Sequence, residues 1–97
     1  MDRNALLLEL VSDALRTTRG TPEHRLPTPL VRLDRLSLSI IDAGLAEEAL
    51  ALAASILDQD RYQDRVYLSN LAERLMLQPV VVRQILADAE HAGELAA

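Results

Sequence analysis

The sequence predicts an all-α fold, and three observations lead to that expectation. Apolar residues recur along most of the chain at the i, i+3, i+4, i+7 spacing of one helix face. Proline and glycine stand where these runs begin and end, as at Pro29 and Gly44. Only one stretch alternates apolar and polar residues, so a strand would have no partner. The 97 residues suffice for one domain, and we expect a single bundle of about five helices over residues 1–97.

The first predicted helix runs from about Arg3 to Thr17, with Asp2 as its N-cap. The helical spacing assigns its inner face to Leu7, Val11, Ala14 and Leu15. The same spacing places Glu9, Asp13 and Arg16 on the opposite, solvated face. This amphipathic helix needs a packing partner.

The next segment, residues 18–28, carries two prolines and one glycine, and we expect an irregular link there. A second helix is predicted from Pro29 to about Ala43, with Thr28 as N-cap and Gly44 as its stop. Residues 36–40 alternate and are compatible with a short strand. Because no second strand candidate exists, the helix is the better interpretation.

The most apolar segment runs from Leu45 to Leu57. Its polar or small stripe consists only of Glu47, Glu48, Ala51 and Ser55. A helix that is apolar around most of its circumference belongs at the centre of a bundle. We therefore expect this helix to be central.

The stretch from Val66 to Leu86 predicts two helices joined by a tight, helix-turn-helix-like corner near the C-terminus. Apolar residues fall at Leu68, Leu71, Ala72 and Leu75, and again at Val82, Ile85, Leu86 and Ala89. Pro79 fits the first position of the second helix, where its missing N–H costs nothing. The two apolar faces must meet each other or a third helix, and we expect the pair to pack across the central helix.

The composition excludes several classes of function. Cysteine is absent, which excludes disulfides, thiolate catalysis and cysteine-ligated metal centres. All ten basic residues are arginine, and fifteen acids bring the formal net charge to −5, so no global field favours a polyanion. No apolar run approaches the ~18 residues of a membrane span. A cytoplasmic protein without a membrane partner is the expectation.

Catalytic patterns are also missing from the sequence. His24 and His91 are far apart and lack an HxH or HExxH context. The serines lack a GxSxG context, and the three glycines are too widely spaced for a phosphate-binding loop. We expect no catalytic residue, no cofactor and no enzymatic activity.

Three carboxylates, Asp58, Asp60 and Asp64, are the candidates for a metal site. Carboxylates two and four residues apart can converge on a hard cation when a loop curls around it. The EF-hand glycine and glutamate are absent, and Arg61 and Arg65 lie between and beside the acids. A solvated corner with surface ion pairs is the favoured interpretation, and no metal is expected.

The candidate binding site for a protein partner lies at the predicted corner. Val80 and Val81 follow Pro79, and helical spacing leaves Val80 largely exposed and Val81 at the border of the inner face. Beside Met76 and Leu77 they would form an apolar patch. Such a patch favours a protein partner or a second copy of the chain.

The second half of the chain resembles the TerB-like helical proteins that are associated with tellurite resistance. The resemblance covers residues 46–90 and rests on Ala53, Ser55, Ile56, Leu57, Asp58, Asp60, Asp64, Tyr67, Leu68, Leu71, Ala72, Leu75, Leu77, Pro79 and Val82. That family usually has glycine where Met76 stands, and its acidic, glycine-rich turn has no match before Gly44. The resemblance implies a stress-associated scaffold or binding protein rather than an enzyme.

A weaker resemblance links residues 71–93 to the helix-turn-helix of bacterial regulators. It rests on Leu71, Ala72, Glu73, Arg74, Leu75, Leu77, Pro79, Val82, Ile85, Leu86, Ala92 and Gly93. It implies DNA contacts by Arg83 and Gln84, with Arg74 nearby, because guanidinium and amide groups suit base edges and phosphates. The negative net charge and the apolar Val80 and Val81 disfavour this alternative.

The sequence therefore favours a non-enzymatic protein-interaction or scaffold module, self-associating or bound to a protein partner. A DNA-binding transcriptional regulator is the alternative. An inhibitor or secretion adaptor, also compatible with the acidic charge, is a third.

Overall fold

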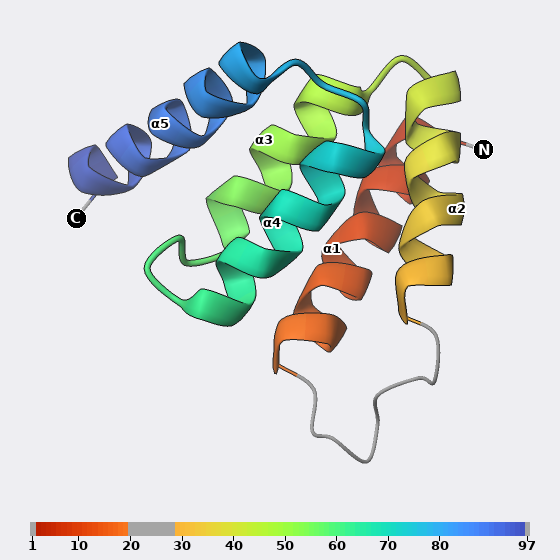
Figure 1. The fold of residues 1–97 in the computed structure, drawn as a ribbon, viewed down its shortest axis with the longest axis horizontal. Coiled ribbons are helices and arrows are strands. Elements are labelled where there is room, and N and C mark those ends of the chain that lie inside the picture. The colour runs from red at the N-terminus through yellow and green to blue at the C-terminus, as the bar shows by residue number, and fades with distance from the viewer. Residues whose placement is uncertain (1, 20–28, 97) are drawn as a thin grey trace.

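The computed structural model describes residues 2–19 and 29–96, and these residues form five α-helices and no strand (Figure 1). The helices are α1 (Arg3–Arg19), α2 (Pro29–Asp42), α3 (Ala46–Ile56), α4 (Tyr62–Arg74) and α5 (Pro79–Ala96). The predicted all-α bundle of about five helices is confirmed.

The central position of α3 is also confirmed, because α3 packs against each of the other four helices. Its alanines Ala49 and Ala53 are fully buried, and side chains of this size let neighbouring helices approach closely. In Figure 1, α2 and α5 lie on opposite sides of the bundle, with α3 between them.

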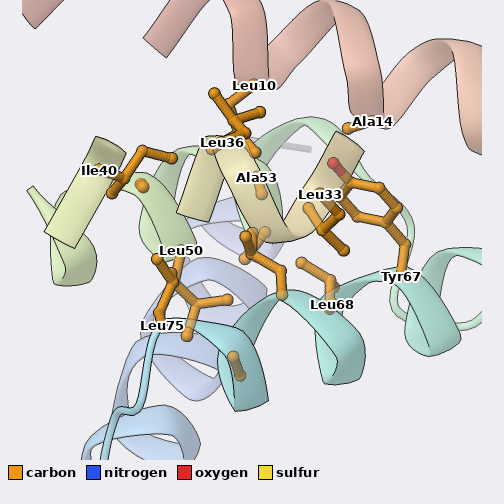
Figure 2. Close-up of a cluster of buried hydrophobic side chains, with 14 of the residues drawn as sticks. Leu10, Ala14, Leu33, Leu36, Ile40, Leu50, Ala53, Tyr67, Leu68 and Leu75 are labelled. Atoms are coloured by element: carbon orange, nitrogen blue, oxygen red, sulfur yellow. The ribbon is translucent and has the colours of Figure 1, made fainter. Parts of the chain in front are cut away.

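The buried core of the described residues is formed by α1 to α4, together with Leu45, Leu57 and Leu75 at the helix ends. Figure 2 shows these side chains converging from the four helices: Leu10, Ala14, Leu33, Leu36, Ile40, Leu50, Ala53, Tyr67, Leu68 and Leu75. The inner face of α5 contributes only half-buried residues, namely Val82, Ile85, Leu86 and Ala89. The last helix is therefore an addition to a four-helix core.

The end of α2 shows the predicted glycine stop. Gly44 has φ +72°, a left-handed conformation that glycine adopts without strain. Its N–H donates to the carbonyl of Ile41, and the N–H of Leu45 donates to the carbonyl of Ile40, both at 3.0 Å. This is the hydrogen-bond pattern of a Schellman motif, and it turns the chain directly into α3.

Two predicted boundaries are wrong. The first helix continues beyond Thr17 to Arg19, where the Thr18 hydroxyl donates to the carbonyl of Ala14 at 2.8 Å. The fourth helix begins at Tyr62 and takes in residues that were expected in the acidic corner. The rest of the predicted link, with the Thr28 cap, falls on residues 20–28 and lies outside the described residues.

The predicted inner face of α1 is also partly wrong. Asp13 was expected in solvent but is buried, whereas Leu15 was expected inside and is exposed. The reason lies on α4, where the hydroxyl of Tyr67 provides a partner for the Asp13 carboxylate. Periodicity within one helix carries no information about a polar partner on another.

Candidate interaction surface

The corner between α4 and α5 consists of residues 75–78. Met76 has φ +59°, and it is the one non-glycine residue with positive φ in the described part of the chain. Its N–H donates to the carbonyl of Glu73 at 3.1 Å, which completes the last turn of α4. Met76 thus occupies the helix-ending position at which glycine is the usual residue.

The predicted partner-binding residues lie in this corner and in the first turn of α5. We call them the corner patch: Met76, Leu77, Val80 and Val81. The Met76 side chain is 82% exposed and Val80 is 59% exposed. Leu77 and Val81 are half-buried, and Leu77 also packs against the core. The corner therefore presents two exposed apolar side chains close together in the chain, next to two half-buried ones.

The helix that follows the corner packs chiefly against α3 and makes little or no contact with α4. A side-chain amide from the α3–α4 loop, Gln59 Nε2, donates to the carbonyl of Leu86 at 2.9 Å. The apolar faces of α4 and α5 therefore both pack against α3. The sequence allowed these faces to meet each other or a third helix, and the structure shows the second arrangement. Contact with a single helix explains why no apolar residue of α5 between Val80 and Ala92 is fully buried.

A comparable exposed apolar residue stands elsewhere on the surface. Leu38 on α2 is 61% exposed. Of its neighbours on the helix surface, Asp34, Arg35 and Asp42 are exposed and charged, and Ile41 is half-buried. A single exposed apolar side chain with charged neighbours is ordinary for a protein surface, and Leu38 therefore provides a control for the corner patch.

The residues of the DNA-binding alternative do not form one basic cluster. Arg74 Nε donates to Asp34 Oδ1 on α2 at 2.5 Å, so its charge is paired. On the exposed side of α5, Gln84 Nε2 donates to Asp88 Oδ1 at 2.8 Å. Arg83 is exposed on the same helix. Among these three residues and within the described part of the chain, the arrangement leaves one guanidinium without an ion pair rather than a basic patch.

Two of the three candidate metal-ligand carboxylates, Asp58 and Asp64, accept hydrogen bonds within the protein. Asp64 lies in the first turn of α4 with 0% exposure, and its Oδ2 accepts the backbone N–H of Asp58 at 2.7 Å. Asp58 Oδ1 accepts the backbone N–H of Asp60 at 2.9 Å. Within the described residues, no group of three or more acidic or histidine side chains is arranged to hold a metal ion.

Polar contacts that the sequence did not predict join α1 and α4. We call these residues the polar seam: Asp13, Thr18, Arg19, Asp64 and Tyr67. Tyr67 donates its hydroxyl to Asp13 Oδ2 at 2.7 Å, and Arg19 Nη2 donates to Asp64 Oδ2 at 3.1 Å. Burial, together with the bond to the Asp13 carboxylate, raises the pKa of the Tyr67 phenol well above its ordinary value.

A signal for the polar seam existed in the sequence. Asp64 and Tyr67 are spaced three residues apart, and so place two polar groups on the face that also carries Leu68 and Leu71. The side chain of each is buried. Polar residues on an apolar helix face predict a buried hydrogen-bond network.

No described helix combines the length and the apolar character needed to cross a membrane. No family model, curated protein or solved structure matches this chain.

Proposed function

We propose that the protein is a small non-enzymatic interaction module that associates with a second copy or another protein through the corner patch. The observation that carries this proposal is the simultaneous exposure of Met76 and Val80 at one corner. Apolar side chains gathered in this way lose contact with water when a partner covers them. Leu77 and Val81 extend the same surface toward the core.

The acidic charge of the protein supports a protein partner over nucleic acid. The formal net charge is −5, and of the three residues expected to contact DNA, Arg74 is already paired with Asp34. Duplex DNA is bound largely through neutralisation of several phosphates by basic side chains. A regulator that reads DNA would need a basic cluster that Arg83 alone does not supply.

The test replaces Val80 with aspartate and measures association by size-exclusion chromatography with light scattering. Val80→Asp places a charge in the centre of the corner patch, and we expect it to weaken self-association or partner binding several-fold. Because the residue is exposed, the far-UV circular dichroism and melting temperature should stay close to those of the wild type.

The matched control is Leu38→Asp, a change of the same kind at a residue of similar exposure on α2. This variant should associate like the wild type. Equal behaviour of Val80→Asp and Leu38→Asp in every association assay would refute the corner patch as the binding surface.

A salt series with mixed duplex DNA tests the alternative on the same samples. Affinity that falls steeply with salt and disappears in Arg83→Ala would replace the interaction module with a DNA-binding function.

A further inference from the structure

The position of α5 in the fold suggests how a second copy would associate. This helix follows a four-residue link, packs chiefly on α3 and carries no fully buried apolar residue between Val80 and Ala92. Elements held by few buried contacts open at a lower free-energy cost than the core does. The fully buried side chains of the described core come from α1 to α4 and from the residues beside these helices, and none comes from α5.

The link itself favours an open form. Met76 holds a left-handed backbone conformation without being glycine, and this strain exists only while the chain turns sharply from α4 toward α3. Pro79 disfavours helical backbone at Gln78, so an opened link cannot simply fuse α4 and α5 into one helix. Short, strained hinges of this kind promote exchange of elements between copies.

We infer that the protein self-associates by exchanging α5, so that α5 of each copy packs on α3 of the other. The α3 face that receives the exchanged helix is the face that α5 covers within one chain, so the fit of the two surfaces is already shown. Exchange restores the packing of Ile85 and Leu86 and the hydrogen bond from Gln59 to the Leu86 carbonyl. This inference rests on the proposed self-association.

The corner patch provides the contacts that a monomer lacks. In an exchanged dimer the two links run past each other near the twofold axis, because each chain crosses there to its partner. The exposed Met76 and Val80 belong to the link and to the first turn of α5. They therefore meet the equivalent residues of the second copy, and the exchange covers the apolar surface that the monomer leaves in water.

The experiment changes the length of the link and keeps the exposed patch residues Met76 and Val80 in place. Wild-type protein is held at high concentration in mild urea, returned to native buffer and separated by size-exclusion chromatography with light scattering. We expect a monomer of 10.7 kDa and a dimer of twice that mass. The isolated dimer should persist after dilution and convert to monomer only when mild urea is added again, because conversion requires release of α5.

Two link variants test the mechanism. Insertion of a Gly-Ser pair between Gln78 and Pro79 removes the strain, and should reduce the dimer fraction several-fold. Deletion of Leu77 and Gln78 prevents α5 from reaching α3 of its own chain, and should leave a dimer with native helicity. If the deletion variant does not fold, the insertion variant and the dilution of the wild-type dimer still test whether α5 is exchanged.

The outcomes separate the exchange from the proposed function. A dimer that dissociates at once on dilution and is unchanged by the insertion would overturn the exchange, while Val80→Asp would still test the corner patch as an ordinary docking surface. A wild-type protein that remains monomeric in this protocol would also overturn the exchange. A dimer that persists on dilution and is lost with the insertion supports it.

Discussion

Tyr67 on α4 donates its hydroxyl to Asp13 on α1 at 2.7 Å, and both side chains are buried. The bond joins residues 54 positions apart in the sequence. Among the described residues, Tyr67 is the hydrogen-bond donor to the buried Asp13 carboxylate. The pair therefore fixes the relative position of α1 and α4, because the hydrogen bond is lost when either helix slides.

Removal of the Tyr67 hydroxyl should be costly. Tyr67→Phe leaves the Asp13 carboxylate buried without this donor, and we expect the free energy of unfolding to fall by about 2 kcal/mol. Tyr62→Phe is the control, since Tyr62 is exposed and its change should cost little. Urea denaturation measures both. Equal stability of the two variants would mean that the Tyr67–Asp13 bond contributes nothing.

Alkaline pH should destabilise the protein through the same residue. The pKa of Tyr67 is raised in the folded state by burial and by Asp13, whereas in the unfolded chain it is about 10. The unfolded state therefore loses the proton first, so this stabilisation is fully present below about pH 10 and is lost as the pH rises toward the folded-state pKa. In Tyr62→Phe, Tyr67 is the remaining tyrosine. Its tyrosinate absorbance should appear together with the loss of helical circular dichroism, and ionisation without unfolding would contradict the raised pKa.

The buried carboxylate of Asp64 should be important for stability. Its Oδ2 accepts the Asp58 N–H and the Arg19 guanidinium, while Oδ1 has no hydrogen-bond partner in the described residues. Asp64→Ala should lower the free energy of unfolding by about 2–3 kcal/mol. This is somewhat less than the loss expected for a wholly buried ion pair, because the partly exposed Arg19 side chain can return to water.

The matched control for Asp64 is Asp60→Ala, at an exposed residue of the same loop region, which should change stability by less than about 0.5 kcal/mol. Thermal and urea denaturation distinguish the two. A loss in Asp60→Ala as large as that in Asp64→Ala would indicate that the whole acidic loop, and not the buried carboxylate, stabilises the fold.

The sequence predicted the parts of this structure that depend on local pattern. Helical spacing identified the core positions Leu68 and Leu71, and glycine identified the turn at Gly44. The pattern failed where a residue on another helix decides the outcome. Asp13 is buried because its carboxylate accepts a hydrogen bond from Tyr67, and Asp64 is buried because its carboxylate accepts one from the Asp58 N–H. For the candidate surface, the pattern predicted the exposure of Val80 but not the left-handed backbone of Met76, which arises from the turn between two packed helices.

Truncation of core residues should distinguish the four-helix core from α5. Leu71 is fully buried, and Leu71→Ala should lower the free energy of unfolding by about 3–5 kcal/mol. Ile85 is only half-buried beside α3, and Ile85→Ala should cost about 1–2 kcal/mol, because part of the lost area is already in water. Urea denaturation of both variants tests this order. Equal losses would mean that α5 is as much a part of the core as α4.

The backbone of Met76 should make glycine the better residue at this position. A non-glycine residue in the left-handed region costs roughly 1–2 kcal/mol, and glycine costs about 0.5–1 kcal/mol through the entropy of the unfolded chain. Because the Met76 side chain is 82% exposed, little packing is lost, and Met76→Gly should stabilise the monomer by about 0.5–1 kcal/mol.

Two controls separate backbone strain from other effects of glycine at Met76. Gln78→Gly, at an exposed link residue without positive φ, should destabilise, because only the entropic cost remains. Gly44→Ala should lower stability by about 1 kcal/mol, because the strain of the left-handed backbone outweighs the entropy that alanine saves, and beyond the two chain neighbours no atom lies within 4 Å of the added methyl group. If Met76→Gly and Gln78→Gly destabilise equally, the turn at Met76 is unstrained, and the contribution of hinge strain to the exchange of α5 is removed.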